Sequence, residues 1–302
     1  MASVPDISAV VISWNTRELL ARCLGSIARE RERAGLTVET IVVDNASSDG
    51  SAAMIEERFR DARLIVLPEN RGFAAANNVA LASARGPAVL LLNPDAELAA
   101  GALDALWRAL HAAPHVGLVG PLLLNSDGSV QSAGHAFPGL AQVLIDLFPL
   151  HPRLVASRLN GRVTRYDGLS PMAIDHPLGA CMLVRRAVVD NVGGLDEGYF
   201  MYSEEIDWCR RIRAAGWTIL LAPAARVVHH GGQSSGQAPE AMFLALHRSR
   251  ARYLRRYEPA WVLPVASRAA GLAAWAAGCR GRPERARALE AVSRLYRVAA
   301  DD

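Results

Sequence analysis

The 302-residue chain lacks lysine entirely, because all 33 of its basic residues are arginine. This absence excludes a P-loop lysine for phosphates, a lysine Schiff base with pyridoxal phosphate and a lysine nucleophile. Cysteine is scarce as well, since the four cysteines lie far apart and form no Cys-x-x-Cys pair. Neither a disulfide framework nor a zinc ribbon is therefore expected, and a reducing cytosol is favoured.

The chain as a whole also carries little excess charge, since its formal net charge is only +3. Residues 248–302 hold 12 arginines against 5 acidic residues, which makes the C-terminal region a basic appendage. Basic residues are not interleaved with aromatics over the main domain, which argues against nucleic acid as a partner. The N-terminus has no basic segment leading into an apolar one. No signal peptide is therefore expected, and the catalytic part should be cytoplasmic.

Apolar runs alternate with helical patterns, in a chain that is 51% hydrophobic and 21% charged. Such alternation predicts an α/β fold with a mostly parallel sheet flanked by helices. Residues 125–177 show no periodicity and are expected to be irregular. The later helix should run from 204 to 215 with Ser203 as its N-cap. Strands are expected at 7–13, 38–43, 63–67, 88–92, 116–124, 181–184, 218–222 and 226–228.

Asn93-Pro94-Asp95 follows the apolar run 88–92, at the carboxyl end of a predicted buried strand. Ligands of open α/β sheets gather at such ends, and a carboxylate there suits a divalent cation that neutralises phosphates. The alternative is an ordinary turn, since Asn-Pro opens turns and Asp caps helices. His229 follows a later strand and would complete a metal site with Asp95, or it is a structural histidine. His230 should face the other way.

Glu205 shares the apolar face of the 204–215 helix with Trp208, Cys209 and Ile212. A desolvated carboxylate on that inward face would have a raised pKa and would suit proton abstraction from a hydroxyl. The alternative is that acidic residues in a first helical turn only complement the helix dipole. Glu204 and Asp207 fit that alternative better.

Several motifs occur together in an ordered set that resembles the family 2 glycosyltransferases, especially bacterial rhamnosyltransferase-like members. The resemblance covers about residues 7–235. The motifs are Ser13-Trp14-Asn15, Val43-Asp44-Asn45-Ala46-Ser47-Ser48-Asp49-Gly50-Ser51, Asn70-Arg71-Gly72-Phe73-Ala74-Ala75-Ala76-Asn77-Asn78, Asn93-Pro94-Asp95, Gly193-Gly194-Leu195-Asp196-Glu197, Glu204-Glu205-Ile206-Asp207 and His229-His230-Gly231-Gly232-Gln233-Ser234.

This resemblance implies a GT-A fold and an inverting transfer of a hexose, rhamnose among the candidates, to a glycan or lipid-linked acceptor in cell-surface polysaccharide synthesis. It implies a dTDP- or UDP-sugar donor and Mg²⁺ or Mn²⁺ held by Asp95 and His229. Glu205 stands where the family's general base is usually Asp, and Asn93 replaces the first Asp of the Asp-x-Asp motif. The donor side would comprise Ser13, Asn15, Asp44, Arg71, Asn77, Asn78, Asn93 and Asp95, and the acceptor side Gly179, Asp196, Tyr199 and Glu204.

Two other functions stay open at this point. One is a nucleotide-sugar-binding protein that has lost catalysis, because Asn93 and Glu205 depart from the family pattern. The other is a dinucleotide-dependent oxidoreductase, although no Gly-x-Gly-x-x-Gly follows the first strand.

The expected domains are a glycosyltransferase domain over 1–238, with a nucleotide-binding half to about 125 and an acceptor half after it, and a basic helical region over 239–302. The stretch 261–279 is near spanning length but contains Pro264, Arg268 and many alanines, so no membrane span is expected. These helices should pack on the catalytic domain, pair with a second subunit, or lie in an anionic membrane interface at the inner face of the cell membrane.

Overall fold

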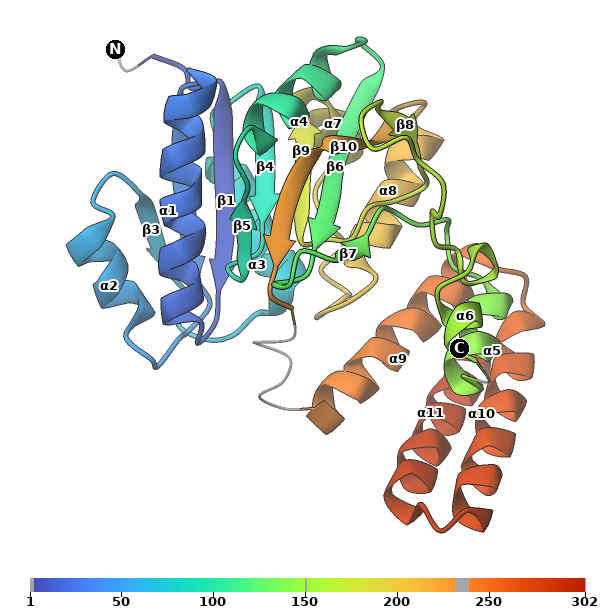
Figure 1. Cartoon of the computed structure of the whole chain (residues 1–302). Helices are drawn as coiled ribbons and strands as arrows, with labels where there is room; N and C mark the ends of the chain where they lie inside the picture. Colours follow the sequence, from blue (N-terminus) through green and yellow to red (C-terminus); the bar gives the residue numbers. More distant parts are fainter. Residues whose placement is uncertain (1–2, 150, 232–238, 302) are drawn as a thin grey trace.

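The computed structural model describes residues 3–149, 151–231 and 239–301 as one mixed sheet flanked by helices, followed by a helical bundle (Figure 1). The end of the His-His-Gly-Gly-Gln-Ser motif and the expected domain boundary at 238 lie outside these residues. The first half of the chain forms β1 (Ile7–Ser13), α1 (Arg17–Ala34), β2 (Val38–Asp44), α2 (Ser51–Arg58), β3 (Arg63–Val66), α3 (Gly72–Ser83), β4 (Ala88–Leu92), β5 (Ala96–Leu98), α4 (Ala102–His111) and β6 (Val116–Leu124).

The second half contains more secondary structure than the sequence predicts. Residues 125–177 were expected to be irregular, yet they include two short strands and α5, whose apolar residues pack against the C-terminal helices. The elements are β7 (Val130–Ser132), α5 (Leu140–Leu147), α6 (Pro152–Val155), the 3-10 turn η1 (Arg158–Asn160), β8 (Met172–Ala173), β9 (Cys181–Arg185), α7 (Arg186–Val192), α8 (Glu204–Ala214), β10 (Thr218–His229), α9 (Pro239–Tyr257), α10 (Val262–Cys279) and α11 (Pro283–Asp301).

The sheet has the strand order β3-β2-β1-β4-β9-β6-β10-β5. Strands β3, β2, β1 and β4 are parallel, as the alternation of strands and helices predicts. β9 inserts antiparallel between β4 and β6, and β5 pairs antiparallel with β10, so parallel pairing holds for the first half and the whole sheet is mixed. The two strands expected at 218–222 and 226–228 form one strand, β10, with a register shift between Ala222 and Arg226.

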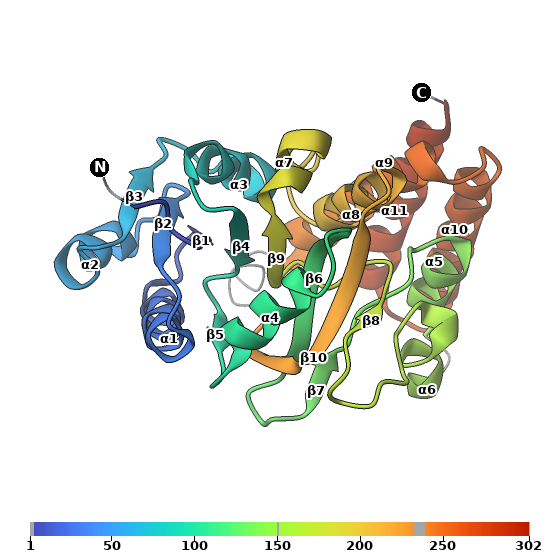
Figure 2. The ribbon, with the colours of Figure 1, turned by 90° about the horizontal axis from the view of Figure 1, so that it is seen from above.

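Helices cover both faces of the sheet (Figure 2). α1, α2 and α4 bury Leu20, Met54 and Leu106 against one face. α3, α7 and α8 cover the opposite face, where Trp208 is fully buried. Because the central strands β4, β9 and β6 are sandwiched in this way, their interiors are continuously apolar, and the polar residues next to them lie at their ends. The site must therefore be sought at those ends.

The C-terminal helices α9, α10 and α11 form a bundle with α5, at the lower right in Figure 1. The bundle has its own buried cluster, which includes Val143 of α5, Tyr253 of α9, Ala270 of α10 and Tyr296 of α11. Among the described residues, one helix, α10, is long and apolar enough to span a membrane, with a mean hydropathy of 1.2. Of that helix 44% is buried, and its buried face, which includes Ala266 and Ala270, packs inside the bundle.

Ion pairs fix α9 to the catalytic domain. Asp207 of α8 is completely buried and accepts hydrogen bonds from Arg211 at 2.8 Å, from Arg256 at 3.0 Å and from the Tyr257 hydroxyl at 2.7 Å. Arg210 donates to the hydroxyl of Tyr253 at 2.8 Å. The expectation that the tail packs on the catalytic domain therefore holds for α9. Asp207 is a docking residue, which goes beyond the helix-dipole role expected of it.

Candidate active site

A cavity of about 460 Å³ opens at the carboxyl ends of β1, β2 and β4, at the lower edge of the sheet in Figure 1. It brings together residues from sequence positions as distant as β1 and α9. Its lining comprises Ile12, Trp14, Asn45, Asn70, Gly72, Phe73, Asn93, Pro94, Asp95, Leu178, Gly179, Ala180, Phe200, Met201, Tyr202, Glu204, Glu205, His229 and Met242.

Asp95 and His229 lie side by side in this cavity, as the sequence predicts. β5 begins one residue after Asp95 and pairs with the end of β10, so that Ala96 is opposite His229. The Oδ1 atom of Asp95 is 3.3 Å from Nε2 of His229, and both side chains are largely buried. His230 faces away and contacts Glu97 at 2.8 Å, as expected from strand alternation.

Gln131 of β7 fixes the tautomer of His229. The Gln131 amide group donates to the carbonyl oxygen of His229 at 3.0 Å and to Oδ1 of Asn125 at 2.9 Å, so its Oε1 must be the acceptor at 2.7 Å from Nδ1 of His229. Nδ1 therefore carries the proton. Nε2 then faces Oδ1 of Asp95 at 3.3 Å, and either a proton on Nε2 or a cation bound by both atoms would satisfy this contact.

The residues present fit a divalent cation. Ligands that bind one octahedral ion at about 2.1 Å in adjacent positions lie about 3 Å apart, which is close to the separation of Asp95 Oδ1 and His229 Nε2. Oδ1 of Asn93 is buried in the same wall and has no hydrogen-bond partner. The described residues contain no group of three or more His, Cys, Asp or Glu side chains that could hold a metal, so two protein ligands would leave the remaining positions to substrate and water.

Glu204 and Glu205, at the start of α8, form an acidic pair that lines the same cavity. Both are buried, with 8% and 5% of their surface exposed, and Oε2 of each has no partner. Burial raises the pKa of Glu205 to about 7. Burial, and then the neighbouring Glu205, raises the pKa of Glu204 well above its usual range. The inward orientation predicted for Glu205 is confirmed, and Glu204, which fitted the helix-dipole alternative better by position but which the family resemblance assigned to the acceptor side, lines the same cavity.

The backbone around this pair is tightly constrained. Gly179 lies against Glu205, where an added Cβ would come within 3.3 Å of the glutamate side chain. Tyr202 and Ser203 both adopt left-handed conformations, with φ of 70° and 66°. Such strain in non-glycine residues is typical of functional sites. Ser203 stands at the N-cap position as expected, but its side chain makes no capping hydrogen bond, because its backbone is left-handed and not in the extended conformation that capping residues usually adopt.

Some of the predicted donor-side residues support the cavity from behind. Asp44 is 1% exposed, with Oδ2 accepting from the Ser47 amide at 3.2 Å and Oδ1 unpartnered. Ser13 contacts the Thr16 hydroxyl at 3.0 Å, and Asn15 accepts from the Ser48 amide at 2.8 Å. These contacts join the loop after β1 to the loop after β2.

Like Ser13, Asn15 and Asp44, three further predicted donor-side residues do not line the cavity. The side chain of Asn77 is buried and donates to the carbonyl of Phe73, one helical turn earlier. Asn78 holds Leu195 through two hydrogen bonds of 2.9 Å to its backbone. The half-exposed side chain of Arg71 lies 3.6 Å from Glu197. Asn78 and Arg71 thereby fix the loop after α7 to α3, whereas the contact of Asn77 stays within α3.

Asp196 and Tyr199, predicted for the acceptor side, are turned towards the bundle. Asp196 pairs with Arg252 at 2.9 Å and with Arg256 at 3.1 Å. Tyr199 is 1% exposed and its ring lies beneath the guanidinium of Arg252 at 5.2 Å. The aromatic loop still reaches the cavity through its other members, Phe200, Met201 and Tyr202.

Two important residues escape sequence reasoning. Asn45 lies within a motif but was assigned no role of its own, yet it donates to Asn70 at 2.9 Å and accepts from the Arg71 amide at 2.9 Å. It therefore shapes the cavity wall. Gln131 gives no sequence signal at all, because it lies in a stretch without periodicity, 98 residues before its partner His229.

Known proteins resemble this chain in sequence and in fold. The model of glycosyl transferase family 2 matches residues 8–193. The N-acetylglucosaminyl-diphospho-decaprenol L-rhamnosyltransferase of Mycobacterium tuberculosis (strain ATCC 25618 / H37Rv) is 31% identical over 275 residues, which is 84% of this chain and 86% of the relative.

Two solved structures show the fold. The mannosyltransferase PcManGT from Pyrobaculum calidifontis, in complex with GDP-Man and Mn²⁺, has a TM-score of 0.57 at 18% identity and covers 99% of this chain and 87% of its own. GalNAc-T7 with UDP, GalNAc and Mn²⁺ has a TM-score of 0.58 at 17% identity and covers 75% of this chain and 43% of its own. These likenesses confirm the expected GT-A fold. The family model that matches residues 8–193 and the relative at 31% identity show that the chain belongs to glycosyl transferase family 2 and is a glycosyltransferase.

Proposed function

We propose that this glycosyltransferase moves a hexose, rhamnose being the first candidate, from a nucleoside-diphosphate donor to a hydroxyl of a lipid-linked glycan, in a metal-dependent reaction that inverts the anomeric carbon. The observation that carries the proposal is that Glu205 and the Asp95–His229 pair line one and the same cavity. The Mycobacterium tuberculosis relative, by its name, transfers L-rhamnose to a diphospho-decaprenol-linked sugar, which supports the choice of sugar and acceptor class.

Charge supports metal dependence. Among the described residues that line the cavity none is an arginine, while Asp95 and Glu205 bring carboxylates and the raised pKa of Glu204 favours its neutral form. A nucleoside diphosphate would be repelled by such a wall unless a cation screened it. A divalent ion at Asp95 and His229 would neutralise the diphosphate and stabilise it as a leaving group. Mg²⁺ and Mn²⁺ both suit this ligand set, and both solved relatives contain Mn²⁺.

The chain's own residues would carry the proton transfer. Glu205 lines the cavity, and its Oε2 makes no hydrogen bond, so this carboxylate has an oxygen that is free to accept the proton of the acceptor hydroxyl. The oxygen of the acceptor hydroxyl, as it loses its proton to Glu205, forms the new bond to the anomeric carbon while the bond from that carbon to the diphosphate oxygen breaks. A second carboxylate positioned as a nucleophile is not required, because Glu205 acts once as a base. With a pKa of about 7, Glu205 is in its basic form above neutrality.

The test is a donor screen by thermal shift with UDP-, dTDP- and GDP-sugars, each with Mg²⁺, Mn²⁺ or EDTA. A specific donor raises the melting temperature, and the proposal expects that rise to depend on the metal. The donor found is then used in a transfer assay with a prenyl-diphosphate-linked sugar. A stabilising donor in EDTA, or transfer that survives EDTA, would contradict the metal role.

A nucleotide-sugar-binding protein without catalysis is the second candidate, favoured by Asn93 and Glu205 at positions where the family pattern has Asp. Glu205→Gln separates the two functions, because it keeps the shape of the side chain and removes the base. The enzyme is expected to lose transfer and keep donor binding. A wild-type protein that binds the donor but transfers no sugar would favour the second candidate.

We further propose that the protein works at the inner face of a membrane, with its C-terminal helices in contact with the lipid. A lipid-linked acceptor requires access to a bilayer, and the bundle is the basic part of the chain.

A further inference from the structure

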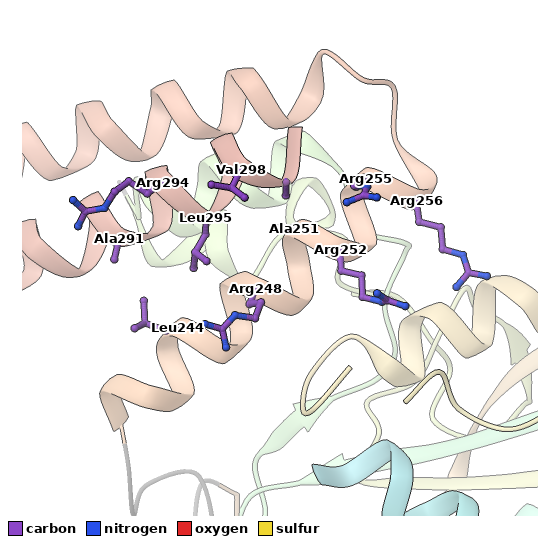
Figure 3. Close-up of a pocket in the computed structure, with 11 residues that line it drawn as sticks. Leu244, Arg248, Ala251, Arg252, Arg255, Arg256, Ala291, Arg294, Leu295 and Val298 are labelled. Atoms are coloured by element: carbon purple, nitrogen blue, oxygen red, sulfur yellow. The ribbon is translucent and has the colours of Figure 1, made fainter. Parts of the chain in front are cut away.

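A groove of about 780 Å³ lies between α9 and α11, on the bundle (Figure 3). It is separate from the catalytic cavity, and no lining residue is shared by the two. On α9 the groove residues recur at positions 244, 248, 251, 252 and 255, which is one face of the helix. Its lining comprises Leu244, Arg248, Ala251, Arg252, Arg255, Arg256, Ala291, Arg294, Leu295, Val298 and Ala299.

Five arginines line this groove and no acidic residue does. Arg252 and Arg256 are already paired with Asp196 at the edge nearest the catalytic domain. Arg248 of α9 and Arg294 of α11 are exposed and have no ion pair or hydrogen bond within residues 3–149, 151–231 and 239–301. Their charge is therefore uncompensated in the protein, and Figure 3 shows the two side chains coming from the two helices that form the groove.

The remaining lining is apolar. Leu244, Leu295 and the alanines form the surface between the arginines, and Val298 is 59% exposed at the rim. A free phosphate would use the arginines and leave this surface unused. A ligand that carries both a phosphodiester and a hydrocarbon chain would match both parts, because guanidinium groups bind phosphate oxygens in pairs and the apolar surface gains by burial.

We propose that the groove binds the headgroup and the upper acyl chain of an anionic phospholipid, with Arg248 and Arg294 on the phosphate. This proposal rests on the proposed function, which includes a membrane contact of the C-terminal helices. It assigns that contact to the α9–α11 groove. Docking there would hold the protein on the bilayer that contains its acceptor, while the catalytic cavity, on the other side of α9, remains open to the donor.

The test is co-sedimentation of the full chain with vesicles of phosphatidylcholine alone and of phosphatidylcholine with 30% phosphatidylglycerol. The Arg248→Gln/Arg294→Gln protein is expected to partition about 30-fold less onto the anionic vesicles, since each arginine near such a surface contributes about a factor of five. Its matched control is Arg287→Gln/Arg297→Gln, which removes two exposed charges of α11 outside the groove. The control is expected to lose much less binding. Val298→Asn, at the exposed rim, should weaken binding without changing charge.

Three results would overturn the proposal. Equal binding of the wild type to neutral and anionic vesicles would exclude an anionic phospholipid as the ligand of the groove. Equal losses of vesicle binding in the two double variants would mean that the basic bundle is attracted diffusely to anionic lipid and that the groove is not a specific site. A wild-type dimer that the groove variant converts to a monomer, with unchanged vesicle binding, would assign the groove to a second copy of the chain. Thermal melts and donor-induced shifts of each variant establish that it is folded and that the catalytic cavity is intact, so a failed proposal here is distinguishable from a failed assignment of function.

Discussion

Replacing Glu205 by glutamine should abolish transfer and, unusually for a buried substitution, stabilise the protein at alkaline pH. The glutamate is 8% exposed, and burial raises its pKa from 4.5 to about 7. A carboxyl whose pKa is higher in the folded state binds protons more tightly there, so stability falls as the pH rises from about 4.5 through about 7. The full difference is worth about 3 kcal/mol, and glutamine, which is neutral at every pH, avoids it.

The neighbouring Glu204 should add to the stabilisation of the Glu205→Gln protein at alkaline pH. Its pKa is raised by its own burial and by the charge of Glu205, so removing that charge should allow Glu204 to ionise at lower pH. Urea unfolding at pH 4 and pH 8 measures the effect. Glu205→Gln should match the wild type at pH 4 and exceed it at pH 8 by up to about 3 kcal/mol.

Activity gives the second readout of the same variant. Loss of a general base costs about 10²- to 10⁴-fold in rate. In the wild type, kcat/KM should rise with pH and level off above about 7, because only the ionised carboxylate accepts the proton. Equal destabilisation of Glu205→Gln at both pH values, or transfer at more than a tenth of the wild-type rate, would refute the reasoning.

The remaining predictions concern the rest of the cavity. Asp95→Ala should remove metal-dependent donor binding, so calorimetry with Mn²⁺ and donor should give no heat above that of the donor alone; undiminished binding would exclude Asp95 as a ligand. Gln131→Leu removes the acceptor for Nδ1 of His229 and should weaken Mn²⁺ binding about 10- to 100-fold, with a changed tautomer in imidazole ¹⁵N spectra. Gly72→Ala should lower both melting temperature and donor affinity, because φ is +80° and an added Cβ would overlap the carbonyl oxygen of Phe200; a protein unchanged in both would show that the turn is not required.

Local patterns predict the part of the fold that depends on neighbours in sequence. The first four strands and their helices follow from apolar runs and periodicity, and Asp95, His229 and Glu205 could be placed because each stands at the end of a strand or on the apolar face of a helix. Pairing of the later strands is non-local, so the antiparallel insertion of β9 between β4 and β6 has no signal in any short window.

Polar contacts are harder to predict than burial. Asn78 was expected to contact the donor, but its partner, Leu195, is 117 residues away, and nothing in the motif reveals that contact. The same holds for Asp207, whose partners Arg256 and Tyr257 lie beyond the catalytic domain. An asparagine or aspartate in a family motif is equally suited to bind a ligand or to support the loop that does, and only the folded arrangement distinguishes the two roles.

The measurement that tests the central claim most directly is the anomeric configuration of the product. With one inward-facing base, Glu205, and the Asp95–His229 pair lining the same cavity, the account predicts a single displacement, so NMR of the product should show the anomeric configuration opposite to that of the donor. Retention of the donor's configuration would contradict the account, because it would require a second displacement that Glu205 acting as a base does not provide.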